Sequence, residues 1–118
     1  MKFILMLKAT VDGEAGKMPS EELIAATIRY NQDQAKAGVL LDAAGLYPSS
    51  TGARVKVSAD GRRTVVEGPF PDPEGLVAGY WIIQAKSIEE AIDWAKRAPA
   101  GPGQEAEIEV RRFIEFGE

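Results

Sequence analysis

Residues 76–85 read LVAGYWIIQA, a stretch that predicts a long β-strand. Side chains alternate between the two faces of a strand. One face here carries Leu76, Ala78, Tyr80 and Ile82, and the other carries Val77, Trp81 and Ile83. Residues 3–7, FILML, are apolar on both faces in the same way. Strands of this kind are buried on both sides, so any fold for this chain must cover two faces of a sheet.

The remaining segments predict two helices, a hairpin and two further strands. Ser20 is a helix cap, and the helix that follows ends at Gly38. Along it, a predicted buried stripe recurs at helical spacing: Leu23, Ile24, Thr27, Ile28, Asn31 and Ala35. A second helix follows the capping-box sequence of residues 87–90 and ends near Pro99, with Ile88, Ala91, Ile92 and Ala95 as its stripe. We expect strands at 39–43 and 105–111, with Ala106, Ile108 and Val110 of the last strand facing inward, and a polar loop that contains Asp12, Gly13, Gly16 and Pro19. A hairpin of 54–57 with 63–67 is expected to turn at Asp60-Gly61.

This order predicts an α+β fold in a single domain, residues 1–118. The pattern strand, helix, strand, hairpin, strand, helix, strand is typical of a ferredoxin-like βαβ-(hairpin)-βαβ arrangement, with two helices on one face of an antiparallel sheet. Two helices cannot cover both faces. We therefore expect a homodimer in which the second sheet face packs against the same face of another copy.

Composition excludes several functions. The 118 residues include 14 Lys and Arg against 18 Asp and Glu, and this net charge of −4 argues against nucleic-acid binding. There is no cysteine and no histidine, so a thiolate nucleophile, a zinc-thiolate site and a histidine base are excluded. We predict no metal and no cofactor, because no calcium-loop, dinucleotide or P-loop spacing is present. The apolar run 3–7 is too short for a membrane span or a signal peptide, so we expect a cytoplasmic protein.

Three segments together carry a family resemblance. Residues 67–70 read EGPF, residues 79–83 read GYWII and residues 87–95 read SIEEAIDWA. With AGVL at 37–40 and GLYP at 45–48, the chain resembles the YCII-related proteins, in particular the subgroup named for an Asp-Gly-Pro-Phe (DGPF) signature. The resemblance implies a dimeric α+β barrel built from ferredoxin-like protomers.

The chain departs from the family pattern at three places. Glu67 stands where the signature has aspartate, and residues 71–74 read PDPE where the family commonly has a Glu-Thr-Lys-Glu-like segment. The histidine that the wider family carries on its first helix, expected near Thr27, is absent. The histidine-dependent chemistry linked to some members is therefore not transferred to this chain.

Two carboxylates are candidate catalytic groups. Glu67, partly desolvated at the mouth of a dimer cleft, could have a raised pKa and act as a general base. Alternatively, it accepts backbone amides of the proline-rich loop that follows and only shapes that loop. Asp42 either points inward, to pair with Arg54 or Arg63 or to approach Glu67, or points outward from an alternating strand.

Aromatic and basic residues are candidates for ligand binding. Aromatic side chains could line a pocket or fill the core and the dimer interface, and Phe70 could also fill the core beneath its loop. The hairpin is locally basic, so an anionic ligand could dock there, or its charges could simply be solvated. The candidate ligand-binding residues are Tyr30, Tyr47, Arg54, Phe70, Tyr80 and Trp81.

Two functions follow. The favoured one is a homodimeric accessory module that binds a small molecule or a partner protein. The alternative is a small cofactor-free enzyme that performs proton-transfer or lyase-type chemistry on a small aromatic or carbonyl substrate, with Glu67 or Asp42 acting together with Tyr30 or Tyr80. Two titratable side chains within hydrogen-bond reach in a closed pocket would favour the enzyme.

Overall fold

A computed structural model of the protein describes residues 1–101 and 103–117. The chain contains six strands and three α-helices in its described part, and two short 3₁₀ turns, η1 and η2, flank the hairpin. The order is β1 (Lys2–Lys8), α1 (Val11–Glu14), α2 (Glu21–Lys36), β2 (Leu40–Gly45), η1 (Ser49–Thr51), β3 (Ala53–Val57), β4 (Arg63–Glu67), η2 (Pro73–Gly75), β5 (Val77–Gln84), α3 (Ile88–Lys96) and β6 (Ile108–Arg112).

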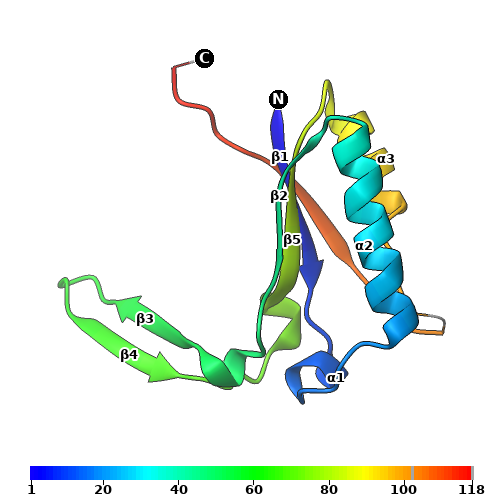
Figure 1. The fold of residues 1–118 in the computed structure, drawn as a ribbon. Coiled ribbons are helices and arrows are strands. Elements are labelled where there is room, and N and C mark those ends of the chain that lie inside the picture. Colours follow the sequence, from blue (N-terminus) through cyan, green and yellow to red (C-terminus); the bar gives the residue numbers. More distant parts are fainter. Residues whose placement is uncertain (102, 118) are drawn as a thin grey trace.

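Four strands form the main sheet in the order β2-β5-β1-β6, and every neighbouring pair is antiparallel. Helices α2 and α3 both lie on one face of this sheet (Figure 1). This strand order, with each helix linking two strands separated by a third, is the ferredoxin-like arrangement, and the predicted α+β fold is confirmed. Strands β3 and β4 form a separate two-stranded sheet that projects away from the main one as an arm (Figure 1).

The core lies between the main sheet and the helices. Phe3 and Leu5 of β1 and Ile83 of β5 are at most 1% exposed. Trp81, also on this face, meets the ring of Tyr30 from α2 edge-on, with 5.1 Å between ring centroids. The Tyr30 hydroxyl donates a hydrogen bond of 2.6 Å to the backbone carbonyl of Trp94 in α3. Tyr30 therefore ties both helices to the central strand.

The predicted helix caps are present. The Ser20 hydroxyl accepts a hydrogen bond from the Leu23 amide at 3.1 Å, and the Ser87 hydroxyl accepts one from the Glu90 amide at 3.2 Å. The Glu90 carboxylate accepts from the amide of Lys86, one residue before the cap. Each cap satisfies an amide that has no partner within its helix.

The predicted buried stripe of α2 is wrong by part of a turn. Ile24 and Ile28 are 43% and 52% exposed, whereas Tyr30 and Gln34 are the buried residues of this helix. The reason is the tyrosine, whose ring packs on Trp81 and whose hydroxyl reaches α3. Periodicity counts apolar residues equally, but a large ring with a hydrogen-bonding end determines which side of the helix faces the sheet.

The stripe of α3 is displaced in the same way. Ala91 and Trp94 are buried, whereas Ile88 and Ile92 are 40% and 39% exposed. The last strand is also shorter than predicted, because β6 begins at Ile108 and Ala106, predicted to face inward, is exposed. Residues 11–14, predicted as loop, form the short helix α1, whose cap is the Thr10 hydroxyl.

Replacing Ile83 by Asp should prevent folding. The side chain is fully buried on the helix face, so a carboxylate there would lose its hydration without gaining a partner, at a cost of at least about 4 kcal/mol. Circular dichroism and chemical denaturation would measure this loss. A cooperatively folded Ile83→Asp variant of near wild-type stability would contradict the placement of β5.

Candidate functional site

A hollow of about 340 Å³ opens at the root of the hairpin arm, between the ends of β2, β3 and η2. It brings together three of the predicted ligand-binding residues, Tyr47, Arg54 and Phe70, which come from separate segments of the chain. Tyr47 is 86% exposed and stands at the rim. The full lining is Glu14, Leu46, Tyr47, Pro48, Ser49, Thr51, Gly52, Ala53, Arg54, Phe70, Gly75, Leu76 and Val77.

Ser49 fastens three walls of this hollow together. Its amide donates to Glu14 Oε2 at 2.9 Å, and its hydroxyl donates to Glu14 Oε1. The same hydroxyl oxygen accepts a hydrogen bond of 3.0 Å from the Phe70 amide. Hydrogen bonds from the Ser49 hydroxyl and amide hold the pKa of Glu14 below its ordinary value. Helix α1, turn η1 and the loop after β4 are thus joined through one serine.

Gly68 explains why the segment after β4 passes so close to η1. Its amide donates to the Gly52 carbonyl at 3.0 Å, and a Cβ atom at this position would lie 1.8 Å from the Ser49 carbonyl oxygen. No side chain fits in that space. The glycine of the EGPF segment is therefore required by a backbone-to-backbone contact.

Phe70 lies outside the core cluster, so the expectation that it fills the core beneath its loop is wrong. Its partly exposed ring instead supports the guanidinium of Arg54, which stacks 3.8 Å above the ring centroid. This cation–π contact holds the guanidinium at the edge of the hollow.

Two other predicted ligand residues lie beneath the helices, away from the hollow. Trp81 is 5% exposed, and its Nε1 donates to Asn31 Oδ1 at 2.7 Å. Tyr30 is equally buried, and burial raises its pKa to about 12. The Gln34 amide lies beside the Tyr30 hydroxyl, fully buried and without a well-formed hydrogen bond among the described residues. These side chains build the core.

Asp42 and Tyr80 form a pair on the sheet face that carries no helix. They come from β2 and β5, and the Tyr80 hydroxyl donates to Asp42 Oδ2 at 3.2 Å. The other Asp42 oxygen accepts from the amide of Ala43. The negative charge of Asp42 raises the pKa of Tyr80, because it opposes formation of a phenolate. The pair is open to solvent and lies apart from the hollow.

Glu67, the other candidate base, ends β4 opposite Ala53 and is exposed. Its carboxylate makes no hydrogen bond or ion pair with any residue in the described part of the chain. It is not among the residues that line the hollow. The structure therefore does not bring Glu67 together with Asp42, Tyr30 or Tyr80.

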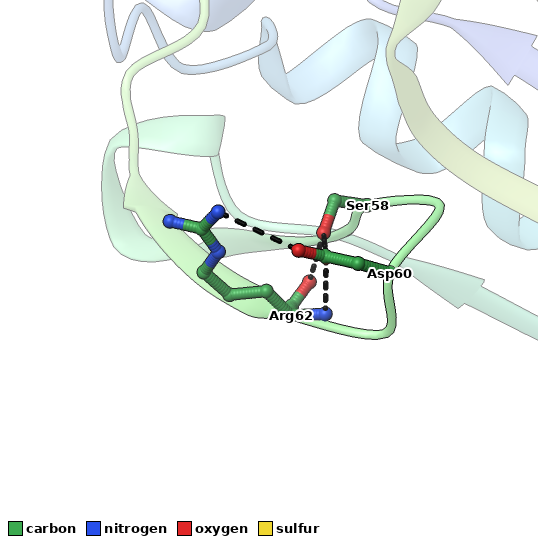
Figure 2. A network of polar contacts seen from close by, with 3 residues as sticks. All are labelled: Ser58, Asp60 and Arg62. Carbon is green, nitrogen blue, oxygen red and sulfur yellow. Dashed lines mark hydrogen bonds and ion pairs between the residues drawn. The ribbon is translucent and has the colours of Figure 1, made fainter.

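The hairpin turn neutralises part of the predicted basic patch. Asp60 accepts hydrogen bonds from the Ser58 hydroxyl and, at 3.1 Å, from the Arg62 amide, and it forms an ion pair with the Arg62 guanidinium at 3.6 Å (Figure 2). The Ser58 hydroxyl is the main cause of a lowered Asp60 pKa. Gly61 closes the turn at φ +88°, a conformation that favours glycine.

Within residues 1–101 and 103–117, no group of three or more acidic side chains is placed to hold a metal ion. In the same residues, no helix has the length and apolar character needed to cross a membrane.

The family model of the YCII-related domain matches residues 1–116, and the chain belongs to this family. It is also similar to an uncharacterized protein of Rhizobium meliloti (strain 1021), with 32% identity over 76 residues. That alignment covers 64% of this chain and 60% of the relative's length.

Sequence reasoning missed Glu14 and Ser49 as parts of the site. The two residues lie 35 positions apart, one in a segment predicted as polar loop and the other in a run of small residues. A lone glutamate among loop residues gives no sign of its partner. The one available signal was the clustering of Gly, Pro and Ser at 45–52 and 68–73, which predicts two loops but not their contact.

Gly68→Ala should destabilise the protein by about 3 kcal/mol or more, since the new methyl group would overlap the Ser49 carbonyl. Gly52→Ala is the matched control, because its Cβ would have only an ordinary contact of 3.6 Å and its backbone is extended. Urea denaturation of both variants tests this. Equal stability of the two would show that the close approach is absent in solution.

Glu14→Gln should lower the melting temperature near neutral pH and have a smaller effect as the pH falls. The folded-state pKa of Glu14 is lowered, so its carboxylate stabilises the fold above the unfolded pKa, and this contribution is lost as pH falls through the folded pKa. Melting curves of both proteins from about pH 7 to pH 3 would show the difference shrinking. A difference that stays constant or grows in acid would contradict the contact with Ser49.

Proposed function

We propose that this YCII-related protein is a homodimeric binding module, in which the helix-free sheet faces of two copies pack together as in a dimeric α+β barrel, and the hollow binds a small molecule. The observation that carries the proposal is the apolar face opposite the helices. Alternation along β1 and β5 places Ile4, Met6, Tyr80 and Ile82 on this face, all partly exposed.

The arm supports the same arrangement. Val55, Val57 and Val65 share one face of the hairpin and are 55–64% exposed. Figure 1 shows the arm projecting beyond the helix-free side of the main sheet, so that a second copy packed there would lie against it. Burying such side chains contributes about 1.5 kcal/mol or more each, which outweighs the effect of single surface charges.

The C-terminal segment offers further apolar surface. Ile114 and Phe116 are 79% and 94% exposed and follow β6 as the chain leaves the sheet (Figure 1). A monomer would leave these side chains, the hairpin valines and the sheet face in water together. Exposed apolar area on this scale is typical of an interaction surface.

Binding is favoured over catalysis because the candidate acid-base groups do not converge. Glu67 has no titratable partner among the described residues, and Tyr30 is sequestered in the core by its hydrogen bond to Trp94. The hollow, in contrast, combines apolar side chains such as Leu46 and Leu76 with the guanidinium of Arg54 and the phenol of Tyr47, groups that can orient a small molecule.

One observation supports the alternative function as an enzyme: the hydrogen bond between Tyr80 and Asp42. In a dimer this pair would lie inside the interface, where Asp42 could act as a base and Tyr80 as a hydrogen-bond donor to a carbonyl oxygen. The raised pKa of Tyr80 keeps its hydroxyl protonated at neutral pH, so the hydroxyl is available as a hydrogen-bond donor. Turnover that Asp42→Asn abolishes would favour this alternative.

We also propose that the protein belongs to the subgroup with the DGPF signature and that it is cytoplasmic. The subgroup assignment is supported by Gly68-Pro69-Phe70, whose glycine and phenylalanine both contact η1. The absence of cysteine suits a reducing compartment.

Sedimentation should give a dimer of about 25 kDa, twice the chain mass of 12.7 kDa. Ile82→Asp should produce a folded monomer, because Ile82 lies on the helix-free face, in contrast to its neighbour Ile83 in the core. Analytical ultracentrifugation with circular dichroism would test both. A stable wild-type monomer at micromolar concentration, or an Ile82→Asp dimer of unchanged affinity, would rule out the sheet-to-sheet interface.

A further inference from the structure

Arg54 is a cation at the hollow that has no carboxylate partner among the described residues. Lys8, Lys17, Arg62 and Arg111, in contrast, each form an ion pair with a carboxylate. Its guanidinium carbon lies over the Phe70 ring, 3.8 Å from the centroid, a distance typical of face-to-face stacking. Since the N–H donors of a guanidinium point outward in its plane, stacking occupies the face and leaves the donor edges available.

The acidic residue of the hollow does not compete for Arg54. Both carboxylate oxygens of Glu14 already accept hydrogen bonds from Ser49. Glu14 therefore stabilises the wall of the hollow through Ser49. The N–H donors of Arg54 remain available to a ligand. Of these two charged groups, Arg54 is therefore the one that can donate hydrogen bonds to a ligand.

From these contacts we infer that the hollow binds a small planar molecule carrying a carboxylate, with Arg54 as the residue that binds the carboxylate. This inference rests on the small-molecule function proposed above and adds the ligand class. Two parallel N–H donors on one edge of a guanidinium match the two oxygens of a carboxylate, and such bidentate pairs are strong and directional. A ligand cation would instead meet the positive charge of Arg54.

The walls account for the planar, apolar part of the ligand. Leu46, Pro48, Leu76 and Val77 line the hollow, and the exposed ring of Tyr47 stands at its rim. The volume of about 340 Å³ is at the small end of the range for ligand pockets and suits a molecule with one or two rings. The Ser49 hydrogen bonds hold these walls in place before a ligand arrives, which lowers the entropic cost of binding.

The test uses three probes of one shape on the full-length protein: benzoate, neutral benzamide and cationic benzamidinium. Binding would be followed through the backbone amide resonances of Gly52 and Gly75, two residues of the hollow. Arg54→Gln removes the proposed carboxylate ligand. Arg63→Gln is the matched control, because Arg63 pairs with Val57 and so lies on the opposite face of the same hairpin.

We expect benzoate to shift both amides, benzamide and benzamidinium to bind at least tenfold more weakly, and Arg54→Gln to lose about tenfold in benzoate affinity while Arg63→Gln stays within twofold. Equal binding of benzamide or benzamidinium at these amides would overturn the carboxylate class but leave the hollow as a ligand site. If Arg54→Gln leaves the affinity for benzoate unchanged, the proposed role of Arg54 is overturned. If none of the three probes shifts these amides, both the ligand class and the small-molecule part of the proposed function fail, whereas the dimer is tested separately by sedimentation.

Discussion

Two helices cover one face of a four-stranded sheet, and in this protein the central strands are apolar on both faces. On the covered face, the rings of Tyr30, Trp81 and Trp94 form the contact that sets the packing. The hydroxyl of Tyr30 adds a hydrogen bond that ties α2 to α3. The helices therefore have little freedom to rotate or slide toward the other face, and the apolar side chains there need another source of cover.

The hairpin arm depends on a second constraint, the contact between two loops at its root. Gly68 allows the chain to pass against the Ser49 carbonyl, and the Ser49 hydroxyl then links Phe70 to Glu14. A larger residue at 68 would push these loops apart and separate the walls of the hollow. The EGPF segment thus connects the arm to the main sheet. Its last residue, Phe70, holds the Arg54 guanidinium at the edge of the hollow through a cation–π contact.

The fold could be predicted from sequence to a large extent, because strand alternation and helix caps are local signals. The two-sided apolar strands, the caps at Ser20 and Ser87 and the hairpin turn at Asp60-Gly61 all depend on residues close in the chain. The rotation of the helices could not be predicted in this way. It depends on tertiary contacts between rings and on the reach of one hydroxyl across 64 positions.

The site was predicted less completely, for a related reason. Residue type identified Tyr47, Arg54 and Phe70 as suited to a ligand, and the structure brings them to one hollow. Residue type also selected Tyr30 and Trp81, because an aromatic side chain has the same character in a core as in a pocket. The predicted carboxylates were Glu67 and Asp42, yet the carboxylate that organises the hollow is Glu14, whose partner lies in a different loop.

The distribution of charge bears on what such a protein can do. Where a carboxylate of the chain has two hydrogen-bonded oxygens, as Glu14 does, its basicity falls and its position becomes fixed. Such a group is suited to building a wall and poorly suited to accepting a proton near neutral pH. A stacked arginine keeps its charge at any pH the protein meets, so it contributes binding but no proton transfer. The groups at the hollow therefore favour recognition over acid-base chemistry, and any catalysis would have to come from the sheet face that carries Asp42 and Tyr80.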